Sequence, residues 1–213
     1  MNLKQTIFTA ALFASAAFCG DISAQEKIAL PEPAITGGMP LNEAIAKRRT
    51  ERDFTPGKLD MQTISDLLYA AWGVSSPDGK RTIPTALNRQ DLVIYVLTPE
   101  KAYRYSDDGK SLVVCAEKDL RKYATKRPGM GEAGSISIVI CGDKGKWKNM
   151  PGAEKYMYTH AGAAMQNLYL ACTSRGLATV ICGSFDGPPL KKELQLPADQ
   201  EILLVQIIGT KKK

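Results

Sequence analysis

Hydrophobic and polar residues follow two different spacings along this chain, and each spacing predicts its own kind of element. Apolar residues at helical spacing predict a helix over 60–73, with Asp60 as its N-cap, and a long helix over 154–174. Gly176 stands where the C′ glycine of the long helix is expected. A shorter amphipathic helix is expected at 41–48.

Strands are predicted where short apolar runs lie between turn residues. A hairpin is expected over 103–115, where Asp107, Asp108 and Gly109 make the turn, and a short helix should follow Pro188 and Pro189. Continuous apolar runs predict buried strands at 92–97, 135–141, 177–182 and 202–208. This order of strands and helices predicts an α+β fold with a mixed sheet.

Small residues occur on several faces of the long predicted helix. Gly162 and Ala163 flank its apolar stripe. A helix with small residues on several faces is usually buried on several faces. We therefore expect the long helix to pack against the sheet and against a second subunit. The chain is therefore expected to form a homodimer.

The first residues have the pattern of a secretory signal peptide. Lys4 precedes an apolar run over 7–18, and small residues lead to a cleavage site near Ala24. We predict a signal peptide over 1–24, a Pro-rich extended lead segment over 25–39 and one domain over 40–213, exported to the periplasm. Lipid attachment through Cys19 is an alternative that bulky Phe18 disfavours.

The charge pattern of the chain favours a small anionic ligand over nucleic acid. The formal net charge is +6, with and without residues 1–24, since these contain one base and one acid. The bases lie in separate clumps, without an aromatic-studded basic strand or a C-x-x-C finger. After residue 24, no segment is apolar enough to be a permanent membrane span.

Neither a metal site nor a hydrolytic site is expected. The chain lacks an H-E-x-x-H motif, a Ser-His-Asp arrangement and an obvious carboxylate pair, and its single histidine, His160, is expected to be structural. Three of the four later cysteines lie in apolar runs, so core thiols are expected in place of disulfides. These four are Cys115, Cys141, Cys172 and Cys182.

Anion-binding side chains cluster in the sequence KRRTERDF at 47–54. Arg48, Arg49, Thr50 and Arg52 fall within five residues, and arginine can bind a phosphate with two parallel hydrogen bonds. A solvated basic helix face is the alternative reading of this cluster. The loop over 75–91 is also long for a simple connection, which is typical of functional loops.

The order of these motifs resembles the FMN-dependent nitroreductase family. The basic cluster is followed by an amphipathic helix, a Pro-Thr-Ala-x-Asn loop, a hairpin, a long helix and Cys-Gly-Ser-Phe-Asp. Within the family, the chain is most similar to the branch of azoline-oxidising dehydrogenases. In that branch the domain opens with the motif Arg-Arg-Ser/Thr-x-Arg-x-Phe, which this chain has at 48–54. The resemblance covers about 40–209 and implies a mainly antiparallel sheet flanked by helices, with the long helix at a dimer interface.

The resemblance also implies roles for individual residues. Arg48 and Thr50 match contacts to the flavin phosphate, and Arg52 matches a cation near the pyrimidine edge, where negative charge develops. Arg49 belongs to the same cluster but has the pattern of a surface residue. Lys211 matches a basic residue that reaches the phosphate, although a frayed, solvated tail over 211–213 is the favoured prediction.

Two further segments match cofactor contacts of the family. Gly183 and Ser184 match a turn whose backbone approaches the central ring, though a simple turn glycine is equally compatible with the sequence. A second set matches a loop that reaches the flavin from the other subunit: Pro84, Thr85, Ala86 and Asn88.

The implied activity is oxidoreduction with FMN as cofactor, in which no side chain is assigned as catalytic because the flavin carries the chemistry. A ping-pong transfer from a donor to a nitro, quinone, enone or azoline-like acceptor is expected. The donor is either NAD(P)H or, given the predicted export, a periplasmic reductant. A flavin-binding or degenerate ligand-binding module without turnover is the alternative.

Overall fold

The computed structural model describes residues 26–148 and 150–212, so the predicted signal peptide and Cys19 lie outside the described residues. One eight-stranded sheet has the order β1-β5-β4-β3-β6-β8-β2, and β7 pairs with β8 outside this path. Every ladder between these strands is antiparallel. The strands are β1 (Lys27–Ala29), β2 (Phe54–Thr55), β3 (Leu92–Leu97), β4 (Ala102–Tyr105), β5 (Ser111–Ala116), β6 (Ile136–Asp143), β7 (Leu177–Cys182) and β8 (Gln200–Lys211).

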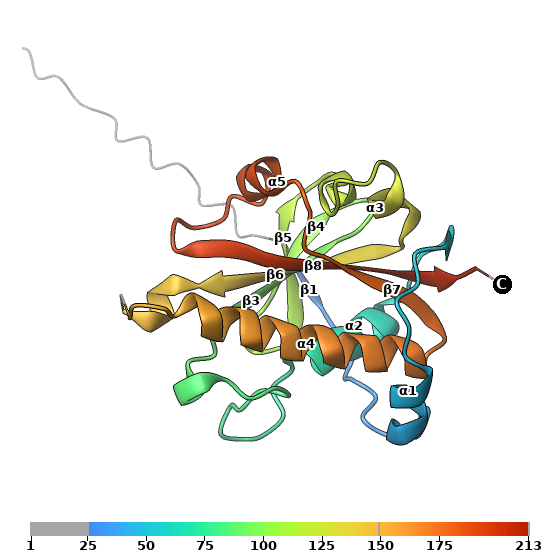
Figure 1. The fold of residues 1–213 in the computed structure, drawn as a ribbon, viewed down its shortest axis with the longest axis horizontal. Coiled ribbons are helices and arrows are strands. Elements are labelled where there is room, and N and C mark those ends of the chain that lie inside the picture. Colours follow the sequence, from blue (N-terminus) through green and yellow to red (C-terminus); the bar gives the residue numbers. More distant parts are fainter. Residues whose placement is uncertain (1–25, 149, 213) are drawn as a thin grey trace, which may run out of the picture.

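Helices cover both faces of the sheet (Figure 1). The elements α1, α2 and α4 lie on one face, and α3 and α5 lie on the other. The helices are α1 (Leu41–Lys47), α2 (Met61–Trp72), α3 (Met130–Ala133), α4 (Glu154–Ser174) and α5 (Gly187–Glu193), with short 3₁₀ turns η1 (Ala86–Asn88), η2 (Arg121–Tyr123) and η3 (Lys144–Trp147). The predicted α+β fold, a mainly antiparallel sheet flanked by helices, is confirmed, but the expectation of a mixed sheet is wrong, because the described strands pair only antiparallel.

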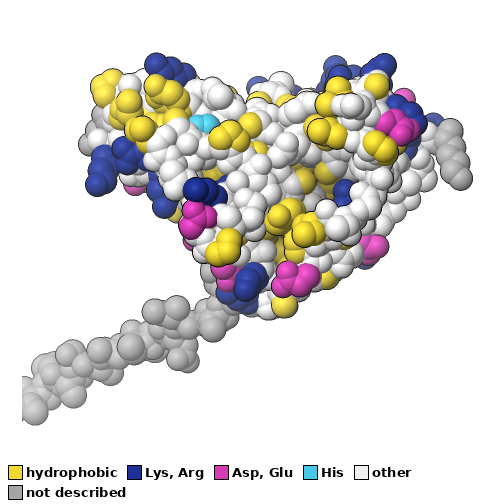
Figure 2. All heavy atoms as spheres, turned by 90° about the horizontal axis from the view of Figure 1, so that it is seen from below, with side chains coloured by type: hydrophobic (Ala, Val, Ile, Leu, Met, Phe, Trp, Pro, Cys, Tyr) yellow, Lys and Arg dark blue, Asp and Glu magenta, His cyan; other side chains and the backbone are white. Residues whose placement is uncertain are grey.

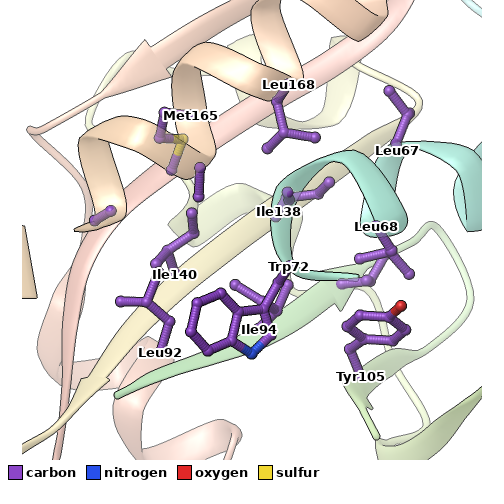
Figure 3. Packing of buried hydrophobic residues seen from close by; sticks show 14 of the residues in the cluster. Leu67, Leu68, Trp72, Leu92, Ile94, Tyr105, Ile138, Ile140, Met165 and Leu168 are labelled. Atoms are coloured by element: carbon purple, nitrogen blue, oxygen red, sulfur yellow. The ribbon is translucent and has the colours of Figure 1, made fainter. Parts of the chain in front are cut away.

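The sheet separates two hydrophobic cores because successive side chains of a strand point to opposite faces. In β6, Ile138 and Ile140 face the core under α2 and α4, whereas Val139 and Cys141 face the core under α5. Figure 3 shows side chains of α2 and α4 meeting the strands in the first core. A strand that is buried on both faces is a continuous apolar run, which explains the pattern that predicted it.

The long helix α4 has the predicted bounds, and its apolar stripe packs on the sheet. Ala161, Met165 and Leu168 are fully buried, while Gly162 is exposed on the flank of the stripe. Gly176, with φ of +68°, follows the helix in the left-handed conformation that glycine adopts most easily. At the start of α2, the Asp60 side chain accepts a hydrogen bond from the Thr63 N–H, as expected of an N-cap.

Two short strands were missed by the sequence pattern. In the lead segment, β1 pairs with β5, and β2 pairs with the end of β8. The lead segment is also attached to α2, where the Asp66 carboxylate accepts from the Ala34 N–H at 2.8 Å and from Arg175 at 2.9 Å. Strands of two or three residues show no periodicity, so only their partners define them.

The prediction of core thiols is confirmed for the cysteines that the structure describes. All four are free, and Cys141, Cys172 and Cys182 are buried. Burial raises the pKa of Cys172 to about 12, so this thiol stays protonated. Over 26–148 and 150–212, no helix is long and apolar enough to cross a membrane.

Candidate functional site

The basic cluster forms an extended segment that is attached to α4 and β7. The hydroxyl groups of Thr50 and Tyr169 lie 2.9 Å apart, and the Glu51 N–H donates to the Thr179 carbonyl. The guanidinium carbon of Arg48 lies 5.0 Å from the centre of the Tyr169 ring, within cation–π distance. Arg48 and Thr50 are therefore held side by side on one aromatic residue of α4.

Arg52 lines a pocket of about 260 Å³ at the end of β7. The loop between β5 and α3 also lines this pocket and is joined to the segment after β7, since the Lys126 N–H donates to the Ser184 carbonyl at 3.0 Å. The pocket contains three cations and no carboxylate, which is suitable for an anionic ligand. It is lined by Arg52, Thr125, Lys126, Arg127, Met130, Val180, Ile181, Cys182, Gly183 and Ser184.

Three arginines of the cluster and pocket keep their charges available, whereas Lys47 is paired with Glu43. Among the described residues, Arg48, Arg52 and Arg127 form no ion pair with a carboxylate. Surface arginines without a carboxylate neighbour can each bind a phosphate or a developing negative charge. The alternative of a merely solvated helix face does not describe this segment, because it is extended and lies beside a pocket.

Gly183 is open toward the pocket. A Cβ atom added there meets no atom of the chain within 4 Å, and the φ angle is not in the positive range that favours glycine. Neither turn geometry nor internal packing requires a glycine at this position. The open backbone fits the close approach of a flat ring, which a side chain would obstruct.

Lys211 and Arg49 are engaged within the chain. The Lys211 ammonium lies 2.6 Å from the Glu51 carboxylate, and its backbone pairs with Phe54 in the sheet. Lys211 is thus part of β8, and the prediction of a frayed tail is wrong for this residue. The Arg49 guanidinium donates to the carbonyl groups of Ala46 and Arg48, on the exposed side of α1.

Within one subunit, the loop that contains Pro84, Thr85, Ala86 and Asn88 lies away from the basic cluster and the pocket. The Ala86 N–H donates to Nε2 of His160 at 2.8 Å, whereas the basic cluster contacts Tyr169. Nine residues of α-helix separate these two contacts by about 13 Å along the axis. The structure therefore brings the cluster and the pocket to one end of α4 and leaves this loop beside the other.

Sequence reasoning missed the wall made by Thr125, Lys126 and Arg127. The only local signal is the Lys-Arg pair before Pro128, which is ordinary for a surface loop. Cys182 also lines the pocket, and burial raises the pKa of its thiol. A hydrogen bond with Thr125 and the charges of Arg52 and Arg127 lower this pKa, but burial has the larger effect. The thiol is protonated at neutral pH and so is a poor nucleophile.

Comparisons with known proteins agree with this architecture. The chain matches the Nitroreductase family over residues 45–210. MJ1384 of Methanocaldococcus jannaschii, provisionally named a nitroreductase, is 28% identical over 183 residues, which cover 80% of this chain and 91% of that protein.

Solved structures give the same result. A protein from Ralstonia eutropha JMP134, provisionally named a nitroreductase, superposes with a TM-score of 0.81 at 32% identity and covers 88% of this chain and 90% of its own. A provisionally named nitroreductase from Desulfovibrio desulfuricans, solved in complex with FMN, has a TM-score of 0.61 at 21% identity, covering 83% and 89%.

The family match spans more than half of the chain, and its bounds contain the basic cluster, the pocket and α4. The chain is a member of the nitroreductase family.

Proposed function

We propose that this chain is an FMN-dependent oxidoreductase whose cofactor lies between the basic cluster and the pocket at Gly183. The observation that carries the proposal is the pocket itself, where three cations without a carboxylate surround an open glycine backbone. Membership of the nitroreductase family and the FMN complex of the Desulfovibrio desulfuricans relative support the choice of cofactor.

Each part of the proposed site suits one part of FMN. Arg48 and Thr50 would bind the phosphate through a guanidinium fork and a hydroxyl group. Arg52 and Arg127 would stabilise negative charge at the pyrimidine edge, and Gly183 and Ser184 would offer backbone groups to the ring. The chemistry that FMN supplies when bound is reversible two-electron transfer.

We further propose that the active form is a homodimer in which the loop at Thr85–Asn88 completes the site of the other subunit. The position of this loop, about 13 Å along α4 from the contact made by Thr50, supports the exchange. Large apolar side chains are exposed at Leu41, Ile45, Leu87 and Tyr158. In Figure 2, hydrophobic side chains gather beside the histidine and again toward the other end of the visible face.

The glycine in α4 supports the same interface. Gly162 is exposed, and an added Cβ would meet nothing within 4 Å. A glycine inside a helix costs about 0.5–1 kcal/mol relative to alanine. Nothing within the subunit explains this cost, whereas a second helix packed close to α4 would.

The substrates are proposed by class. A reduced donor would leave before a small organic acceptor enters, in a ping-pong sequence, and the acceptor would be a nitro, quinone, enone or azoline-like compound. Export, as predicted from residues 1–24, favours a periplasmic reductant over NAD(P)H as donor.

The chain also resembles the Escherichia coli McbBCD microcin synthetase, at 18% identity and a TM-score of 0.68. This likeness concerns the fold alone and does not contribute to the choice of substrate.

Purified protein tests the proposal directly. We expect a yellow protein, or uptake of added FMN, with absorbance that bleaches on reduction and returns when a nitro compound or quinone is added. FMN uptake without reoxidation by any acceptor would favour the alternative, a binding module without turnover. Protein that stays colourless in saturating FMN would contradict the flavin site.

A further inference from the structure

A buried polar chain lies beneath the N-terminal half of α4. The Asp91 carboxylate is 0% exposed and accepts a hydrogen bond from the Trp147 indole N–H at 2.7 Å. Its other oxygen lies 2.7 Å from Nδ1 of His160, whose exposed fraction is 4%. A carboxylate that is completely buried needs such partners, because burial of an unpaired charge is very unfavourable.

The hydrogen bonds determine which nitrogen of His160 carries the proton. A backbone N–H can only donate, so Nε2 must accept from the Ala86 N–H at 2.8 Å and is unprotonated. The proton is then on Nδ1, which donates to Asp91. Asp91 thus orients the ring and its tautomer in the way that a carboxylate commonly orients a functional histidine.

The segment that His160 contacts has an unusual backbone. Leu87, Asn88 and Gln90 all have positive φ angles, of 54°, 50° and 46°, although none is a glycine. Left-handed conformations of such residues persist only where the surroundings hold them, and they cluster at functional sites. Leu87 at the tip is 73% exposed, so the strained segment is presented outward.

Other hydrogen bonds lie at the base of the tip, where the Gln90 side chain donates to the Gly79 carbonyl at 3.0 Å and to Asn88 Oδ1 at 3.3 Å. The Gln90 N–H donates to the Thr85 hydroxyl at 3.1 Å, and Arg81 donates to the Gln90 side chain at 3.0 Å. The Arg89 guanidinium lies 5.7 Å from the centre of the Trp147 ring, which joins the loop to the same buried chain. At Ala86, the attachment to α4 is the hydrogen bond to His160.

We infer that His160 is a positioning residue: with Asp91, it holds the strained loop over Thr85–Gln90 in the shape that presents Asn88 to the cofactor of a second subunit. The loop-holding role stands on the contacts above, and the cofactor role rests on the proposed function. His160 acts through the loop and does not itself touch the reacting atoms.

Limited proteolysis of the purified protein without FMN tests the holding role. Trypsin cuts after Arg89, inside the loop. In His160→Leu, which lacks the acceptor, we expect cleavage after Arg89 to be at least tenfold faster. His160→Gln, which retains an acceptor, should restore much of the protection, whereas Thr159→Ala, beside it on α4, should cleave like the wild type. An unchanged rate in His160→Leu would overturn the inference.

A titration with FMN tests the cofactor role separately. We expect the dissociation constant of FMN to rise about tenfold in His160→Leu and much less in His160→Gln. A loosened loop with unchanged FMN affinity would overturn the cofactor role alone. Failure of the wild type to bind FMN would overturn the proposed function, while the proteolysis result would still decide the holding role.

A second variant covers the case in which circular dichroism shows that His160→Leu is unfolded. Asp91→Asn cannot accept from both Trp147 and His160, because one oxygen becomes an NH₂ group. We expect faster cleavage after Arg89 together with a shift in tryptophan fluorescence, to which Trp72 and Trp147 contribute. A shift in fluorescence without faster cleavage would contradict the inference.

Discussion

The hydroxyl group of Thr50 lies 2.9 Å from that of Tyr169, which joins the proposed phosphate-binding segment to the C-terminal half of α4. The same Tyr169 hydroxyl accepts from the Ile181 N–H at 3.3 Å. One phenol therefore links the cluster, the long helix and the strand that leads into the pocket. Its position makes the geometry of the proposed site depend on α4.

Tyr169→Phe should lower the free energy of unfolding by about 1–2 kcal/mol, since the hydroxyl makes two hydrogen bonds. FMN affinity should fall several-fold because Thr50 loses its support. Urea unfolding and a flavin titration measure the two effects. Loss of FMN affinity without loss of stability would mean that the hydroxyl contacts the ligand directly.

Arg48→Ala should weaken FMN binding by about 10- to 100-fold, because a hydrogen bond to a charged group contributes about 1.5–3 kcal/mol. Arg49→Ala is the matched control, since the Arg49 guanidinium is bound to the Ala46 and Arg48 carbonyl groups. Fluorescence titration with FMN compares the two variants. Equal effects of both substitutions would refute the phosphate assignment.

Gly183→Val should leave the free energy of unfolding of the protein without FMN within about 0.5 kcal/mol of the wild type, because the site is open. FMN affinity should nevertheless fall at least tenfold, since the new side chain would occupy the position of the ring. Ser184→Ala, which adds no atom, serves as the control. Normal FMN affinity in Gly183→Val would place the ring elsewhere.

Gly162→Leu should weaken the proposed dimer, while Gly162→Ala should stabilise the helix by about 0.5–1 kcal/mol. The subunit itself leaves room for the added Cβ, since nothing lies within 4 Å of it and the position is exposed. Sedimentation equilibrium over a range of concentrations gives the dissociation constant. A dimer of unchanged affinity in Gly162→Leu would show that α4 is not at the interface at this point.

Acid should weaken the attachment of the lead segment at Asp66. Burial alone would raise the pKa of Asp66, but hydrogen bonds from Ala34, Arg175 and Gln62 outweigh it and hold that pKa below its usual value. The stabilisation is therefore complete above the unfolded-state pKa of about 4 and is lost as pH falls below it.

The comparison with Asp66→Asn isolates this contribution. The wild type should be more stable than Asp66→Asn at pH 6, and the difference should shrink toward pH 3. Urea unfolding at several pH values measures it. A difference that is independent of pH would mean that the charge of Asp66 does not stabilise the lead segment.

Local patterns were sufficient to predict most elements. The bounds of α4, β3 and β7 follow from apolar spacing, because each element buries its own residues at a regular period. The site could be predicted only in part. The cluster at 48–52 is contiguous and therefore visible, whereas Arg127 joins Gly183 from a loop more than fifty residues away.

By itself, the sequence determined the periodicity of the helices and strands, the basic cluster and the order of motifs, since these depend on residues that are neighbours along the chain. Only the tertiary structure decided which distant residues share a pocket, that Lys211 pairs with Glu51, and that His160 reaches the loop at Ala86. These relationships arise when the sheet and α4 pack together, because burial brings together side chains whose separation along the chain carries no periodic signal.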